Sequence, residues 1–236
     1  MIRNRLITLV LAFTACATNQ TIVPPEQRAS LKRNLEGQDR YLKLSYYVTP
    51  FFGDATKRLL TPVPPDQVRL LEETDGTPIN PGTVEATFPA GTEVRIRLLE
   101  FPTALAQTER VLVTPRTQPW LYVDVAGTPR DAPPYVLVLR PQIKDDRELH
   151  AEVDRWLSRE NPKTKLSSFS DVVQNAVASK RVVIDMPAEA LEMAWGYPDR
   201  RVLALEGERK KETWIWPGPR QVVLLDGKVS ELPAER

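Results

Sequence analysis

The sequence predicts an α+β protein in which a β-rich half precedes a half of mixed helices and strands. Between residues 41 and 140, short apolar stretches alternate with turn signals, which is typical of strands at regular spacing. The 22 prolines against 10 glycines favour short elements with fixed turns over long helices. After residue 140, apolar residues recur at helical spacing before strand patterns return, so helices and strands are segregated along the chain.

The first 15 residues have the pattern of a secretion signal. Arg3 and Arg5 are followed by a mostly apolar run from Leu6 to Phe13. This run is shorter than the about 20 residues that a membrane-spanning helix needs, and it fits the apolar region of a signal peptide. Residues 1–15 are therefore interpreted as a signal peptide, directly followed by Cys16, the only cysteine of the chain.

The segment Phe13-Thr14-Ala15-Cys16 resembles the lipobox of bacterial lipoproteins. The resemblance implies that Cys16 receives lipid on its sulfur, becomes the new N-terminus and attaches the protein to a membrane. It also implies a location in the bacterial cell envelope, at the outer membrane facing the periplasm. The alternative is an ordinary signal peptide that is cut before Thr18, which would discard the cysteine and release a soluble protein.

Residues 16–40 are predicted to be a lipidated tether that holds the folded part away from the membrane. They begin with a polar stretch that contains the pair Pro24-Pro25. A short helix in the second part of this segment is the alternative, because Leu31 and Leu35 share one helical face.

Residues 41–160 form the predicted β-rich domain, a small barrel or sandwich that ends in a helix. Its clearest strand covers residues 93–98, where apolar and charged side chains alternate. Further strands are predicted at residues 42–48, 68–71, 110–114, 120–125 and 135–140. The helix is predicted over residues 143–159, with Asp145 in place to cap it.

The pattern Ala90-Gly91-Thr92-x-Val94-x-Ile96, followed by Trp120-x-Tyr122-Val123-x-Val125, resembles the bacterial SH3-like barrel. In that family a Gly-Thr turn opens one strand and a Trp begins a later one. The resemblance implies a ligand-binding module that holds a cell-wall peptide or an extended polypeptide in an aromatic groove. The candidate binding residues of this groove are Trp120, Tyr122 and Tyr135.

A break at residues 161–165 separates the second predicted domain, residues 161–236. Two helices are expected in it, over residues 171–178 and 185–195. Three strands are expected to follow, over residues 202–205, 213–216 and 222–225. The dipeptide Asp226-Gly227 marks a hairpin turn. The expected unit is a helix packed on a three-stranded antiparallel meander.

This second domain resembles the SmpA/OmlA-type domain of small outer-membrane lipoproteins. The matching residues are Met186-Pro187, Ala194-Trp195-Gly196-x-Pro198, Glu212-x-Trp214-x-Trp216 and Asp226-Gly227-Lys228-Val229. The resemblance implies a non-enzymatic adaptor whose partners are other envelope proteins. Trp195, Trp214 and Trp216 are candidate anchors for such a partner, and packing in the core is the alternative for each ring.

Composition argues against several other functions. The 32 Lys and Arg residues nearly balance the 31 Asp and Glu residues, which does not favour a nucleic-acid partner. One His and one Cys cannot build a Cys/His zinc site, and no cofactor-binding motif is present. The carboxylates of Asp145, Asp146 and Glu148 are better interpreted as helix capping than as an acid–base pair. The expected protein is a non-catalytic adaptor without a small-molecule cofactor.

Overall fold

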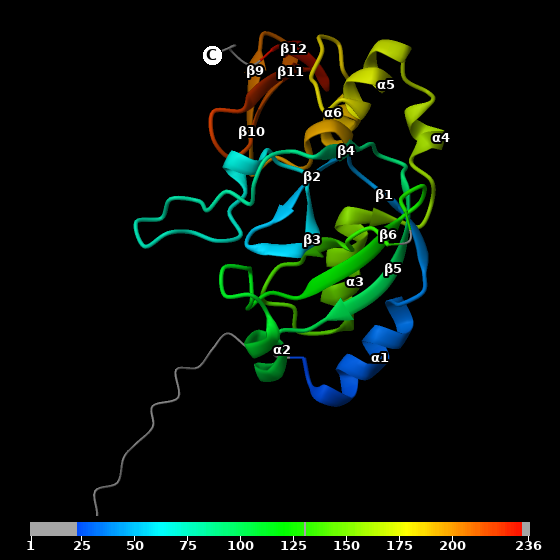
Figure 1. The fold of residues 1–236 in the computed structure, drawn as a ribbon. Helices are drawn as coiled ribbons and strands as arrows, with labels where there is room; N and C mark the ends of the chain where they lie inside the picture. Colours follow the sequence, from blue (N-terminus) through cyan, green and yellow to red (C-terminus); the bar gives the residue numbers. More distant parts are fainter. Residues whose placement is uncertain (1–22, 130, 233–236) are drawn as a thin grey trace, which may run out of the picture.

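The computed structural model describes residues 23–129 and 131–232, which form two sheets with helices packed against them (Figure 1). One sheet has eight strands and the other has four. This arrangement confirms the predicted α+β class. The expected signal peptide, Cys16 and the first part of the expected tether lie outside the described residues.

The larger sheet has the strand order β4-β2-β3-β7-β6-β5-β1-β8. Its strands are β1 (Asp39–Leu42), β2 (Tyr46–Phe51), β3 (Asp54–Thr61), β4 (Ala86–Phe88), β5 (Glu93–Glu100), β6 (Trp120–Val125), β7 (Tyr135–Val138) and β8 (Leu157–Ser158). All neighbours are antiparallel except β3 and β7, which are parallel. Within the described part of the chain this sheet stays open, with β4 and β8 as its edges. The predicted barrel is therefore wrong.

The course of the chain near Ser45 also differs from the prediction. The apolar stretch 42–48, predicted as one strand, is divided at Ser45 between β1 and β2. These two strands lie toward opposite edges of the sheet and pair with different neighbours. The Ser45 hydroxyl donates to the carbonyl of Val177 at 2.8 Å and accepts from the Ala90 N–H at 3.0 Å, which fixes this division.

Two predicted strands are wrong. Residues 68–71 follow a short 3-10 helix, η1 (Pro65–Gln67), and lie in a loop with Val68 buried. Residues 110–114 form a turn after α2 (Ala104–Glu109). Three consecutive apolar side chains at 111–113 suggest a strand, but contacts made by Arg110, described below, bend the chain back.

The expected tether is wrong from Val23 onward, and the helix alternative is found instead. Helix α1 (Pro25–Leu35) begins earlier than the alternative proposed. Leu31 and Leu35 are buried on its inner face, and Val23 is buried just before it. These three side chains belong to the main core beside the larger sheet. The chain is therefore part of the folded core from its first described residue, Val23.

Helix α3 (Asp146–Trp156) completes this first core. Its first turn is capped as expected, because an Asp145 carboxylate oxygen accepts from the Glu148 N–H at 2.8 Å. Leu149 and Val153 are buried one turn apart against the sheet.

The C-terminal unit has its own core between helices and the smaller sheet. Its helices are α4 (Lys163–Leu166), α5 (Asp171–Ala178) and α6 (Ala188–Trp195). Its antiparallel strands are β9 (Arg200–Glu206), β10 (Arg209–Ile215), β11 (Gln221–Leu225) and β12 (Lys228–Glu231), in the spatial order β12-β11-β10-β9. The expected meander of three strands has a fourth, because the turn at Asp226-Gly227 returns the chain along β11.

In Figure 1 the four-stranded sheet lies at the upper end of the molecule, and α1 and α2 lie at the lower end. No helix among residues 23–129 and 131–232 is both long and apolar enough to cross a bilayer.

Candidate interaction surfaces

Trp120 and Tyr122 do not form an exposed groove. Both rings are buried beside Phe51, and the Trp120 and Phe51 rings meet edge to face at 4.8 Å. They are covered because β6 is a central strand with side chains packed on both faces. The expectation that these two residues bind a ligand on an exposed surface is therefore wrong.

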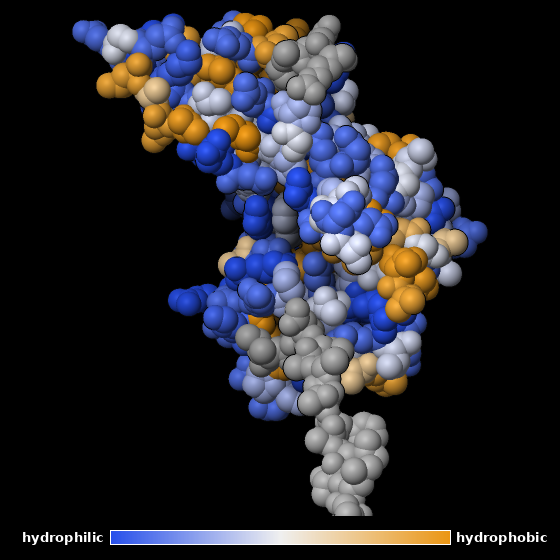
Figure 2. Space-filling view, turned by 90° about the vertical axis from the view of Figure 1, so that its left-hand side faces the viewer, coloured by the Kyte–Doolittle hydropathy of each residue, from blue (hydrophilic) through white to orange (hydrophobic). Residues whose placement is uncertain are grey.

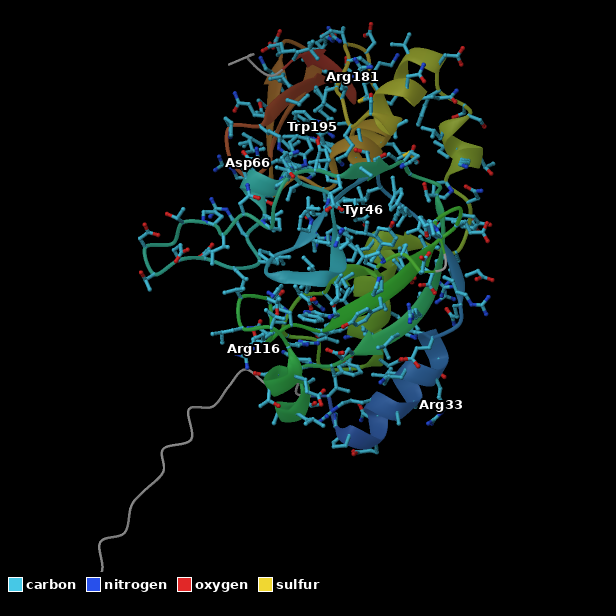
Figure 3. The ribbon with its side chains drawn as sticks, viewed as in Figure 1. Arg33, Tyr46, Asp66, Arg116, Arg181 and Trp195 are labelled. Carbon is cyan, nitrogen blue, oxygen red and sulfur yellow. The ribbon has the colours of Figure 1, made fainter. Side chains whose placement is uncertain are left out.

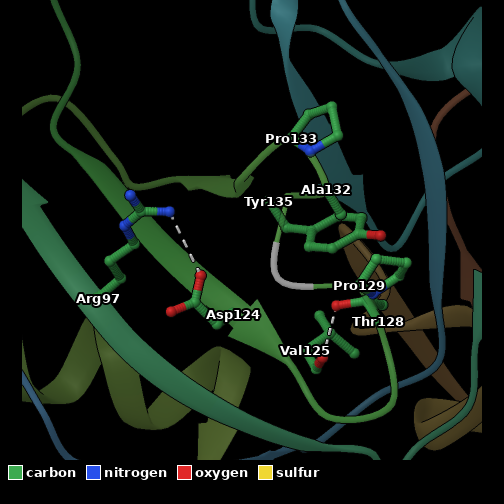
Figure 4. A pocket seen from close by; sticks show the side chains of 8 residues that line it. All are labelled: Arg97, Asp124, Val125, Thr128, Pro129, Ala132, Pro133 and Tyr135. Carbon is green, nitrogen blue, oxygen red and sulfur yellow. Dashed lines mark hydrogen bonds and ion pairs between the residues drawn. The ribbon is translucent and has the colours of Figure 1, made fainter.

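Tyr135, the third candidate, is half-buried and lies beside an open pocket of about 370 Å³ (Figure 4). The polar groups of the pocket are largely paired with each other. Arg97 lies 3.6 Å from the carboxylate of Asp124, and the Thr128 hydroxyl donates to the Val125 carbonyl at 2.7 Å. The Tyr135 ring packs edge to face on Phe88 at 5.2 Å. The pocket is thus a small polar hollow with a single aromatic wall.

Two of the three candidate tryptophans of the C-terminal unit are packed in its core. Trp214 and Trp216 are buried, and each indole N–H has a partner: Glu212 at 2.9 Å for Trp214, and the Gly196 carbonyl at 3.0 Å for Trp216. Trp195 is partly buried and meets the Trp216 ring edge to face at 5.3 Å. Core packing, the alternative to partner anchoring, therefore describes Trp214 and Trp216.

A buried lysine joins the two units. The ammonium of Lys180 donates to the carbonyls of Ser45 and Ala194, each at 2.6 Å, and lies 4.7 Å from the centre of the Tyr47 ring. Burial lowers the pKa of Lys180 well below its usual value. Because its two carbonyl partners lie in different units, Lys180 fixes the position of one sheet relative to the other.

Arg220 makes a second connection between the units. Its Nε donates to the side chain of Gln67 at 2.6 Å, and its guanidinium lies over the Trp195 ring at 5.0 Å. Burial lowers the pKa of Arg220 to about 10. In Figure 3, Trp195 lies in the C-terminal unit and Tyr46 lies in the larger sheet below it.

An open groove of about 370 Å³ lies along this junction, between the loop after β3 and the C-terminal unit. Tyr46, Leu70, Trp156 and Pro217 contribute to its mostly apolar walls. None of the candidate binding residues from the sequence lines it.

An exposed apolar surface that sequence reasoning missed begins on α2, at the lower end of the molecule. It continues along the loop after α2, where Val111 and Val113 lie against Gly53 in the turn between β2 and β3. We call it the apolar tip, and it consists of Leu105, Val111, Leu112 and Val113. Leu105, Leu112 and Val113 are 67%, 76% and 52% exposed. A groove of about 420 Å³ between α1 and α2 adjoins Leu105 and includes Pro25, close to the first described residue. Figure 3 places Arg116, from the same loop, beside α2.

The loop of the tip is held rigidly by Arg110, whose side chain is buried. Its guanidinium pairs with Glu100 at 2.6 Å and donates to the carbonyls of Arg116 and Gln118 at 2.6 and 2.8 Å. It also stacks on the Trp120 ring at 3.7 Å. Because contiguous exposed apolar patches often mark interaction sites, the apolar tip is a candidate interaction surface.

The upper end carries a second exposed surface, the strand β9. All seven of its residues are exposed, and β9 is an edge of the smaller sheet. Leu203 and Leu205 are 64% and 77% exposed. In Figure 2 this end shows hydrophobic side chains in orange among charged ones.

Comparison with protein-family models, with curated proteins and with solved structures finds no match to this chain. Among the described residues, no group of three or more His, Cys, Asp or Glu side chains is placed to hold a metal ion. The candidate interaction sites are the apolar tip, the exposed strand β9 and the apolar groove at the junction of the two units.

Proposed function

We propose that this protein is a lipid-anchored, non-catalytic adaptor of the bacterial cell envelope, at the outer membrane and facing the periplasm. Cys16 is its lipidation site, and other envelope proteins are its partners. The observation that carries the proposal is the groove between α1 and α2, which brings the exposed Leu105 of the apolar tip close to Pro25 and so to the first described residues.

Chain length links this end to the membrane. Seven residue steps separate Cys16 from the buried Val23, and a fully extended chain of that length reaches at most about 25 Å. A lipid on Cys16 would therefore hold α1 and α2 close to the bilayer. The aliphatic side chains of the tip then suit the boundary between headgroups and acyl chains, where apolar faces insert about 5–10 Å.

Charge on α1 agrees with this orientation. The helix carries three cationic side chains, Arg28, Lys32 and Arg33, against one carboxylate, Glu26. Cationic side chains near a bilayer are attracted to anionic headgroups. The opposite end, with the four-stranded sheet, would then point away from the membrane.

The proposal is tested by the intact mass and location of the mature protein in bacterial cells. We expect the wild type in the membrane fraction, beginning at Cys16 and carrying diacylglyceryl and acyl mass. Cys16→Ser should lack this mass and leave the membrane fraction. A conservative Ser30→Ala variant, altered in an exposed part of α1, serves as the matched control and should behave as wild type.

An unmodified, soluble species that begins at Thr18 would contradict the proposal. It would favour the alternative, a secreted ligand-binding module, and the apolar groove between the two units would be the place to search for its ligand.

A further inference from the structure

We propose that β9 pairs with β9 of a second copy of this chain, so that two four-stranded sheets join into one across a two-fold axis. This inference does not depend on lipid anchoring. It rests on the exposure, the side chains and the charge pattern of a single strand.

The backbone of β9 is available for pairing. The strand is hydrogen-bonded to β10 on one side, and its other side is an edge. Edge strands in soluble proteins are usually protected by proline, by inward-pointing charge, by a bulge or by a covering element. The sequence Arg-Arg-Val-Leu-Ala-Leu-Glu contains no proline, and its residues 202–205 carry no charge. Its one charge on the helix-covered face, Arg201, is already paired with Glu192 of the same chain. Its seven-residue pairing with β10 runs without a bulge.

The side chains of β9 also lack cover. Leu203 and Leu205 stand opposite Glu212 and Lys210 of β10, on the face that the helices cover over Trp214. That cover ends at Arg201, which pairs with Glu192 of α6 and stacks on Trp214 at 4.0 Å. Beyond this contact the two leucines remain exposed.

The charge pattern identifies a second copy as the occupant. In an antiparallel pair centred on Leu203, that residue faces Leu203 of the partner subunit, and Arg200 faces Glu206 of the partner subunit. The two-fold axis repeats the Arg–Glu pair at the other end, so the strand is complementary to itself. Within the described residues, the Arg200 side chain makes no hydrogen bond or ion pair. Glu206 binds Lys211 at 2.8 Å and retains oxygen lone pairs for a second cation.

The register gives a sharp test by disulfide crosslinking. Leu203→Cys is introduced into the full chain together with Cys16→Ser, so that the new thiol is the only one in the protein. Because Leu203 would lie on the two-fold axis, its two Cα atoms would be about 4.5–5.5 Å apart, which is within disulfide reach. Leu205→Cys in the same background is the matched control, because its two copies would be about 13 Å apart along the strands.

We expect mild oxidation to convert Leu203→Cys to a dimer on a non-reducing gel and to leave Leu205→Cys monomeric. Sedimentation velocity on the protein with an unaltered β9 should show a concentration-dependent dimer, and Ala204→Pro should reduce it to monomer. Equal crosslinking of both cysteine variants would overturn the proposal. So would a monomer at every concentration, including the case in which another protein is captured at β9 in cells.

Discussion

Lys180 is 4% exposed, and its ammonium contacts two carbonyls and an aromatic ring rather than a carboxylate. A neutral amine still has two N–H groups, which is enough for the carbonyls of Ser45 and Ala194. The junction between the units is therefore compatible with deprotonation of Lys180, and burial favours the neutral amine. A sequence gives no sign of this role, because Lys180 lies among polar residues after α5.

This geometry predicts a pH dependence of stability. The folded-state pKa of Lys180 lies below the value of about 10.4 expected in the unfolded chain. Between the two values the unfolded state binds more protons, so this group makes the free energy of unfolding increase as pH rises. Relative to Lys180→Met, the wild type should therefore gain stability from neutral pH toward pH 10 in urea unfolding.

Tyr47 and Arg220 face Lys180 and are retained in both proteins, so the comparison isolates the lysine. The exposed Lys228→Met is the control and should follow the wild type at every pH. Parallel curves of unfolding free energy against pH for wild type and Lys180→Met would show that burial does not lower the pKa of Lys180.

The buried aromatic residues show which properties of single residues can be predicted from the sequence. The sequence identified the aromatic residues as important, but it did not show whether their rings are buried or exposed. In β6, five of six residues are buried because strands flank it and side chains pack on both faces. The run Trp-Leu-Tyr-Val is nearly continuous in apolar residues, and that pattern is typical of a strand covered on both faces.

At the scale of elements, the predictions were correct where the local sequence pattern alone determines the secondary structure. The predicted strand 120–125 and the predicted helix 171–178 appear with the same bounds as β6 and α5. Residues 110–114 have a similar apolar composition but form a turn, because Arg110 binds the carbonyls of Arg116 and Gln118. Such a contact depends on side-chain geometry and has no periodic signal in the sequence.

The end of α6 allows a prediction about a single glycine. Gly196 has φ +82°, and a Cβ there would lie 3.1 Å from the Cβ of Pro62. Gly127 has φ +84° with open space around it. Gly127→Ala should cost only the left-handed strain, about 1–2 kcal/mol. Gly196→Ala should cost more, because its ψ of −174° at positive φ is a conformation almost confined to glycine and because Pro62 would also have to move.

Urea unfolding of the two alanine variants checks this difference, with Gly76→Ala as a further open-space control. Equal losses of stability for Gly196→Ala and Gly127→Ala would contradict this prediction.

At the scale of the whole molecule, α1 and α2 lie at one end and the four-stranded sheet with β9 lies at the other (Figure 1). The end with α1 and α2 holds the first described residues and Leu105 of the apolar tip, and the other end holds the exposed leucines of β9. This arrangement suits a protein that a short N-terminal segment tethers to a membrane, because one end can face the lipid while the other end points away from it. The arrangement could not be predicted from the sequence, because the segment expected to be a tether is folded from Val23 onward.

The central claim is that a lipid on Cys16 holds the apolar tip against the bilayer. The most direct test places a fluorophore at Leu112→Cys or at Leu205→Cys in the mature protein, in vesicles that contain lipids spin-labelled near the headgroup. The natural cysteine should not react, because its sulfur carries lipid. We predict strong quenching at position 112 and little at position 205. Labelling of Cys16 itself, or equal quenching at both positions, would contradict the account.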